Sequence, residues 1–377
     1  MYQITRSCVI AAVRQRLFAP WQKVVLAVMI LGTLYSLPAA AAAAAPSGTT
    51  PKGKLAAKPL YRDPVMDGAA DPTVIWSSKY NKWFMFYTSR RANVPGLRGV
   101  SWVYGTPIGI ATSADGGATW KYLRNADMIF KKAVSDPTYW APAVVEQNGL
   151  YHMFVVYIPG IHVRWAGPGH IIHLTSKDLI HWHYVSTLPL SGSEVIDPCL
   201  LHLPNGTWRL WYKNNATGSS CDYADSPNLY HWKDHGRVPG LSDVPGEAPL
   251  AFHWKGPYWL FRDIGYALAL YRSDNALHWK RVGTMLQHPG TGAGDKGVGH
   301  HPEVILSRGR AYLFYFVQNH RRSCIQVTEL KYNAGKDVLT VNRNAPTYIN
   351  LQPPRNPETE SKFEPSAMIP SSSRAGR

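Results

Sequence analysis

Cysteine is scarce in this chain. Only 4 of its 377 residues are Cys, and Cys8 precedes the region where a fold is expected. Cys199, Cys221 and Cys324 remain, an odd number without a CxxC spacing. The sequence therefore offers no disulfide framework and no thiolate metal site. A single disulfide between Cys199 and Cys221 stays open at this stage.

Acidic residues and helical patterns are also few. The chain holds 24 Asp and Glu against 40 Lys and Arg, a formal net charge of +16. No basic run lies on a recognition helix, so we expect no nucleic-acid partner, although acidic polysaccharide remains compatible with such a surface. Apolar residues at helical spacing are nearly absent, which excludes an all-α fold. HExxH, Ser-His-Asp and phosphate-loop patterns are missing as well.

Long apolar runs are confined to the N-terminus. The run 24–37 follows four basic residues and precedes an Ala tract at 39–45. A basic flank, a short apolar stretch and small residues are typical of a secretory signal, and the run is too short for a confident membrane span. We expect residues 1–45 to be a signal peptide and 46–57 a flexible linker. The mature protein would then be secreted or periplasmic without membrane contact, although a retained N-terminal anchor stays open.

Aromatic residues, in contrast, are abundant. They make up 12% of the chain, with 14 Trp and 21 Tyr, and indicate a folded protein with a large core. Five Pro residues each open a short apolar run that turns into a second run rich in Trp, Tyr and Phe. These are Pro72, Pro142, Pro198, Pro249 and Pro302. A period of about 50 residues built from short strands indicates one recurring unit, as in a propeller.

A second landmark recurs in four of the units: a Ser, then Asp or Asn, then a Trp. The pairs are Ser113/Trp120, Ser176/Trp182, Ser226/Trp232 and Ser273/Trp279. Short polar side chains favour a turn there, and the Trp would anchor an outer strand. We therefore predict an all-β fold, a five-bladed β-propeller with four antiparallel strands per blade, over residues 58–350. The tail 351–377 is predicted to be disordered.

The residues that head the five units differ, while the motif behind them repeats. They are Asp71, Trp140, Asp197, Glu247 and His301. If every unit starts its innermost strand near a common axis, these heads meet at the centre. Glycoside hydrolysis needs two carboxyl groups in different protonation states, and a third carboxylate can raise the pKa of the acid. The heads therefore predict acid–base chemistry on the axis.

These motifs resemble glycoside hydrolase family 43, whose members are five-bladed propeller glycosidases. The resemblance covers about residues 60–345 and includes Gly246-Glu247-Ala248-Pro249 and Gly299-His300-His301. It implies that Asp71 is the general base, Asp197 the modulator of the acid's pKa and Glu247 the general acid of an inverting single displacement. It implies no cofactor for the chemistry. His301, or alternatively His300, would lie on the axis against substrate and a structural calcium ion.

Three alternatives stay open. The segment 299–303 (GHHPE) is also similar to the anhydro-galactosidase propellers, where a His replaces Glu as the acid; His301 would then protonate the leaving group. A non-catalytic carbohydrate-binding propeller would keep the aromatic residues without needing three carboxylates. The third alternative is a sialidase, which only the Ser-Asp turn supports. The sequence lacks an evident arginine triad for the carboxylate of such a substrate. Arabinosyl, xylosyl and galactosyl linkages of plant or algal oligo- and polysaccharides all fit, and the oligomeric state is not predicted.

Insertions at 88–107 and 158–169 and a Gly-rich loop at 284–299 interrupt the repeat. Loops on a rigid scaffold often carry specificity. We expect Trp140 to form an apolar wall for the sugar, and Trp102 and Trp165 to contact substrate. Further candidates in these insertions are Tyr104, His162 and Arg164.

Overall fold

The computed structural model of the chain describes residues 53–131, 133–241, 243–355 and Lys362. The predicted signal peptide 1–45 lies outside these residues, as does most of the predicted linker. Within the part that is described, no helix is both long enough and apolar enough to cross a membrane.

Four of the sheets hold four antiparallel strands each, joined in simple sequence order. Blade one comprises β2 (Ala69–Ser77), β3 (Lys82–Ser89), β4 (Ile108–Ser113) and β5 (Lys121–Asn125). Blade three comprises β11 (Val195–His202), β12 (Trp208–Asn214), β13 (Ser220–Ser226) and β14 (Lys233–Arg237). Blade four comprises β15 (Glu247–His253), β16 (Tyr258–Asp263), β17 (Leu268–Ser273) and β18 (Lys280–Met285). Blade five comprises β19 (His300–Ser307), β20 (Arg310–Asn319), β21 (Arg322–Asn333) and β22 (Val338–Val341).

Blade two has one strand more than predicted. It comprises β7 (Thr138–Gln147), β8 (Leu150–Ile158), β9 (His170–Ser176) and β10 (His181–Thr187). The extra strand β6 (Asp127–Ile129), which follows blade one in the chain, pairs in parallel with β10 at the outer edge. The described elements also include two short 3-10 turns, η1 (Ser101–Val103) and η2 (Asn215–Thr217). The predicted five-bladed β-propeller is confirmed.

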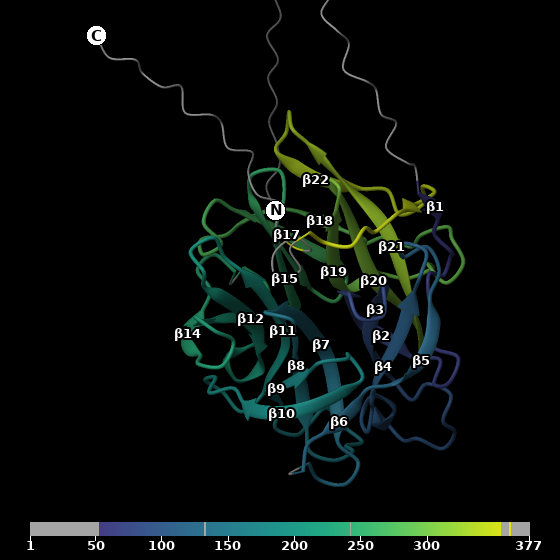
Figure 1. Cartoon of the computed structure of the whole chain (residues 1–377), viewed down its shortest axis with the longest axis vertical. Helices are drawn as coiled ribbons and strands as arrows, with labels where there is room; N and C mark the ends of the chain where they lie inside the picture. Colours follow the sequence, from purple (N-terminus) through teal and green to yellow (C-terminus); the bar gives the residue numbers. More distant parts are fainter. Residues whose placement is uncertain (1–52, 132, 242, 356–361, 363–377) are drawn as a thin grey trace, which may run out of the picture. The chain divides into compact units, whose positions relative to one another are not determined.

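The five inner strands form the wall of the axis. Strands β2, β7, β11, β15 and β19 contact one another in a closed cycle and surround the centre in Figure 1, while β5, β10, β14 and β22 lie at the rim. Large aromatic residues pack between the blades, and Trp182, Trp208, Trp211 and Trp259 are fully buried. Burial of such rings is the main driving force for stacking the sheets.

The ring is closed by the N-terminal segment. Strand β1 (Lys54–Leu55) pairs with β23 (Tyr348–Ile349), and Tyr61 bridges to Ile325 of blade five. The predicted boundaries are therefore corrected at both ends. Residues 54–55 of the predicted linker 46–57 are part of the fold, and Leu351 and Lys362 of the predicted tail 351–377 are buried. The other residues of that tail beyond 355 lie outside the described ones.

The Ser-Asp turns form as predicted. Ser113 Oγ donates to Asp115 Oδ1 at 2.9 Å, and Ser176, Ser226 and Ser273 make the same bond to Asp178, Asn228 and Asn275. Such local hydrogen bonds satisfy the backbone of a tight turn.

The disulfide left open by the sequence is absent. Cys199 and Cys221 are both buried and free, as is Cys324. Burial raises the pKa of Cys221 to about 12, so this thiol is inert at neutral pH.

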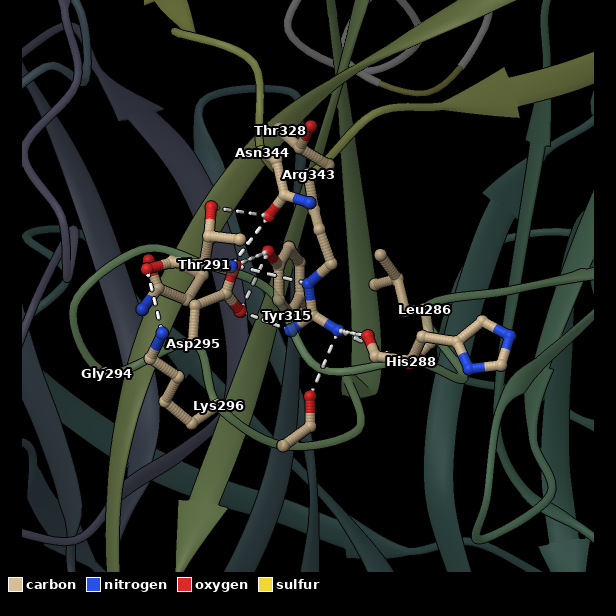
Figure 2. A network of polar contacts seen from close by, with 12 residues as sticks. Leu286, His288, Thr291, Gly294, Asp295, Lys296, Tyr315, Thr328, Arg343 and Asn344 are labelled. Atoms are coloured by element: carbon tan, nitrogen blue, oxygen red, sulfur yellow. Dashed lines mark hydrogen bonds and ion pairs between the residues drawn. The ribbon is translucent and has the colours of Figure 1, made fainter.

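The Gly-rich loop 284–299 is held by a buried network, shown in Figure 2. Asp295 is buried against Arg343 and accepts a hydrogen bond from Tyr315 at 3.1 Å. Arg343 Nη1 also donates to the carbonyls of His288 and Gly297, at 2.7 and 3.0 Å. A buried ion pair is stable only when further hydrogen bonds satisfy both groups, as here. This loop therefore joins blades four and five.

Candidate active site

The five inner strands share one irregularity. In each, the pairing with the second strand slips at the residue before the Pro. That residue has a left-handed backbone in every blade: φ is 53° at Asp71, 47° at Ala141, 58° at Asp197, 48° at Ala248 and 44° at His301. Such a backbone is uncommon for residues other than glycine, and a bulge redirects the side chain. The repeated Pro thus marks one bulge per blade.

The predicted heads do not all occupy this bulge. Asp71, Asp197 and His301 do, whereas Trp140 and Glu247 lie one residue earlier. Asp71 and Asp197 are 4% and 6% exposed. The side chain of Glu247 is 47% exposed. The site consequently has two buried acidic residues, Asp71 and Asp197, and one accessible acidic residue, Glu247.

Side chains from the preceding blade hold three of the bulges. The backbone N–H donates to Thr88 Oγ1 at Ala141, to Asp197 Oδ2 at Ala248 and to Asp263 Oδ2 at His301, at 2.9, 3.1 and 3.1 Å. His300 Nδ1 also lies 3.0 Å from Asp263 Oδ2. Asp197 therefore fixes the residue that follows Glu247 in the chain.

Asp71 is a buried carboxylate that faces Arg90 and His301. Arg90 Nη2 lies 3.1 and 3.3 Å from its two oxygens, and His301 Nδ1 lies 3.3 Å from Oδ1. Burial alone would raise the pKa of Asp71, but the charges of Arg90 and His301 outweigh it and hold the pKa below its usual range. Asp71 is therefore ionised at neutral pH. Arg90 was not among the predicted site residues, although it lies near the start of the insertion 88–107.

The pKa of Asp197 is shifted in the opposite direction from that of Asp71. Burial raises its pKa to about 6; the charge of His301 opposes that rise and the charge of Glu247 adds to it. Asp71 contributes in the same direction as Glu247. His301 faces Asp71, and the backbone N–H of the residue after Glu247 donates to Asp197, so direct contacts link these residues in two pairs.

Glu247 is paired with a lysine that sequence reasoning missed. Lys213 Nζ on β12 lies 2.9 Å from Glu247 Oε2, and the Lys213 side chain is largely buried. Burial would lower the pKa of Lys213, but the charges of Glu247 and Asp197 outweigh it and raise the pKa. Lys213 directly follows the apolar run Leu210–Tyr212. A charged residue at the end of such a strand was the sequence signal that could have identified it. The ammonium fixes the direction of the Glu247 carboxylate.

A cavity of about 410 Å³ opens beside this pair. Its lining includes Tyr104, Trp140, Trp165, Lys213 and Glu247. The ring centre of Trp140 is 5.0 Å from that of Tyr104 and 6.2 Å from that of Trp165. Aromatic rings beside a few polar groups are typical of small-ligand pockets. The positions of Trp140 and Trp165 suit the roles predicted for them.

The two insertions join to form one wall of this cavity. Val100 N donates to Val163 O at 3.2 Å, and Tyr104 Oη donates to Ala166 O at 3.0 Å. Trp102 is buried beneath that wall in a cluster with Val156. It does not line the cavity, so its position suits support of Tyr104 better than the predicted sugar contact.

The residues near His301 do not fit the calcium ion that the resemblance implied. Among residues 53–355, without 132 and 242, and Lys362, no three His, Cys, Asp or Glu side chains are placed to hold a metal. His301 Nδ1 faces Asp71, and the nearby Glu303 is paired with Lys362. Calcium takes 6–8 oxygen ligands, which this arrangement does not offer.

No model of a known protein family matches the chain. An alignment 156 positions long, which covers 36% of this chain and 11% of the other protein, is 27% identical to a fructan β-fructosidase of Streptococcus mutans. A family 43 enzyme of Xanthomonas citri, solved with xylose, superposes with a TM-score of 0.54 at 15% identity, covering 74% of this chain and 91% of that one. The fold is that of the family 43 glycoside hydrolases.

This family 43 fold is shared with related enzymes. A family 117 glycoside hydrolase of Zobellia galactanivorans also gives a TM-score of 0.54, at 14% identity, over 73% of this chain and 87% of that one. Glu247 lines the cavity, whereas His301 is directed at Asp71.

Proposed function

We propose that this chain is a glycoside hydrolase that inverts the anomeric carbon in one displacement. The observation that carries this proposal is that half-buried Glu247 lines an aromatic-walled cavity, while Asp197 holds the residue after it and Asp71, on another inner strand, is ionised. Two carboxyl groups held in different protonation states are what glycoside hydrolysis requires.

In the proposed reaction, Asp71 takes a proton from water as the water oxygen bonds to the anomeric carbon. The glycosidic C–O bond breaks, and Glu247 gives its proton to the departing oxygen. The charge of Glu247 adds to the rise in the pKa of Asp197, so the two carboxyl groups are close enough to interact. Glu247 is the accessible member of the pair, and Lys213 fixes its direction.

The substrate we propose is the terminal sugar of a plant or algal oligosaccharide. The wall formed by the two insertions closes one side of the cavity and favours exo action. Xylosyl, arabinosyl and galactosyl units remain the candidates, and the xylose in the Xanthomonas citri structure makes xylosides the first to test. The N-terminal sequence supports a secreted or periplasmic enzyme.

The test is hydrolysis of aryl xylosides, arabinofuranosides and galactosides by wild type and Glu247→Gln. Loss of a general acid costs about 100-fold or more in kcat, and the loss should be smaller for a dinitrophenyl leaving group, which needs no proton. Glu194→Gln in the same cavity is the matched control and should stay near wild type. Early proton NMR should show the inverted sugar.

Other outcomes reject this assignment. A retained anomer would exclude the single displacement. Full activity in Glu247→Gln with loss in His301→Gln would favour the anhydro-galactosidase alternative. Sugar binding without turnover of any glycoside would favour a carbohydrate-binding propeller.

A further inference from the structure

A second ring of residues lies behind the bulges. In each inner strand, regular pairing resumes two residues after the bulge, opposite an aromatic residue of the second strand. The ring consists of Thr73, Ala143, Cys199, Leu250 and Glu303, all buried. Glu303 is its carboxyl group. A buried carboxylate without a counter-charge is strongly destabilising.

The counter-charge comes from a distant part of the chain. Lys362 Nζ lies 3.1 Å from Glu303 Oε2, and both side chains are almost fully buried. The carbonyl of Lys362 accepts a hydrogen bond of 2.8 Å from the backbone N–H of His253. His253 ends β15, the strand on which Glu247 is the first residue. Lys362 thus approaches Glu303 from the end of the axis opposite the candidate active site.

The electrostatics around this pair are consistent with two charged groups. Burial raises the pKa of Glu303, and the Lys362 ammonium opposes that rise. Burial would lower the pKa of Lys362, but the Glu303 charge outweighs it and raises the pKa. The third titratable group is Cys199, whose thiol pKa is raised by burial against the opposing charge of Lys362.

The Thr73 hydroxyl supports the same carboxylate. Glu303 Oε1 and Thr73 Oγ1 are both buried, and a hydrogen bond from Thr73 opposes the rise in the pKa of Glu303. Thr73 therefore helps to hold the carboxylate that faces Lys362.

We propose that Glu303 forms a buried cation site on the propeller axis and that the ammonium of Lys362 is its resident cation. The site selects a primary ammonium group, and Lys362 thereby fastens the ring from within. This inference does not depend on the proposed hydrolase activity, because Glu303 does not line the cavity beside Glu247 and the readout below is stability.

The test compares the melting temperatures of four proteins. Lys362→Met keeps the apolar stem but removes the charge, and we expect a drop of about 5–10 °C because Glu303 is left unpaired. Adding Glu303→Gln to Lys362→Met should recover most of that drop. The control is Lys331→Met, which breaks the exposed ion pair with Glu329 and should change little.

A second measurement probes the site itself. Lys362→Ala leaves space for an added amine, so millimolar propylammonium should raise its melting temperature but not that of Lys362→Ala/Glu303→Gln. A melting temperature of Lys362→Met equal to wild type would overturn the proposal. So would a double variant no more stable than Lys362→Met, or an absence of any rise with propylammonium, butylammonium and methylammonium.

Discussion

At the residue scale, one backbone geometry serves different chemistries. The same left-handed bulge carries Asp71, Asp197 and His301 in three blades and an Ala in the other two. Each such residue costs about 1–3 kcal/mol and persists only where its surroundings hold it. Side chains of the preceding blade supply part of that support, as Asp263 does for His301. The bulge sets the direction of the side chain, and the residue type sets what chemistry that side chain can do.

Lys213 provides a residue-scale prediction. Its charge lowers the pKa of Asp197, which is about 6. In Lys213→Met that opposing charge is lost, so the pKa of Asp197 rises. A plot of kcat/KM against pH has a limb that reports the titration of Asp197. In Lys213→Met this limb should move to higher pH. Lys213→Arg, which keeps the charge, is the control. An identical profile in wild type and Lys213→Met would contradict the electrostatic role.

At the element scale, the two insertions act as one unit although they belong to different blades. The contact between Tyr104 Oη and Ala166, together with the ring contacts of Trp140, holds Trp165 over the cavity. Trp165 is nevertheless 70% exposed. An exposed aromatic ring held on a rigid loop is well placed to stack on a sugar ring.

Trp165→Ala tests this wall. We expect the KM for an oligosaccharide to rise by up to about tenfold, because one aromatic contact contributes about 0.5–1.5 kcal/mol. The kcat should change little, since the Trp165 side chain takes no part in the proposed proton transfers. Tyr266→Ala, an equally exposed aromatic residue outside the cavity lining, should leave both constants unchanged. A fall in kcat with constant KM would argue against a binding role.

At the scale of the whole molecule, packing between blades makes stability depend on pH. His152 Nδ1 lies 2.9 Å from His173 Nε2, and Phe154 stacks on His173 with ring centres 4.5 Å apart. Burial lowers the pKa of His152 to about 4 and that of His173 to about 3. Tyr230 closes the cluster edge-on. The fold therefore requires both imidazoles to be neutral.

The sign of the effect follows from linkage. The unfolded chain binds protons at these His near pH 6.5, while the folded chain does not until about pH 4 or below. Stability should fall as pH drops from 6.5, by about 5 °C or more in melting temperature at pH 4.5. His173→Phe should flatten this dependence. A melting temperature that is constant between pH 7 and 4.5 would contradict the prediction.

The sequence by itself determined the blade count, the Ser-Asp turns and the phase of the five Pro residues. Each is set by local chemistry: a short side chain bonding its own backbone, a fixed proline φ, and alternating apolar residues. Because these signals repeat, they predicted the propeller and the positions of Asp71, Asp197 and Glu247 near the starts of inner strands.

Only the tertiary structure decided which heads are buried and which charges face them. Glu247 lies one residue before its bulge, and Arg90, Lys213 and Lys362 reach their acidic partners from other strands or loops. Cys199 and Cys221 stay apart, and β1 closes the ring from within a predicted linker. Such pairings depend on where distant segments meet. A shift of one residue along a strand changes them, and no local sequence pattern encodes them.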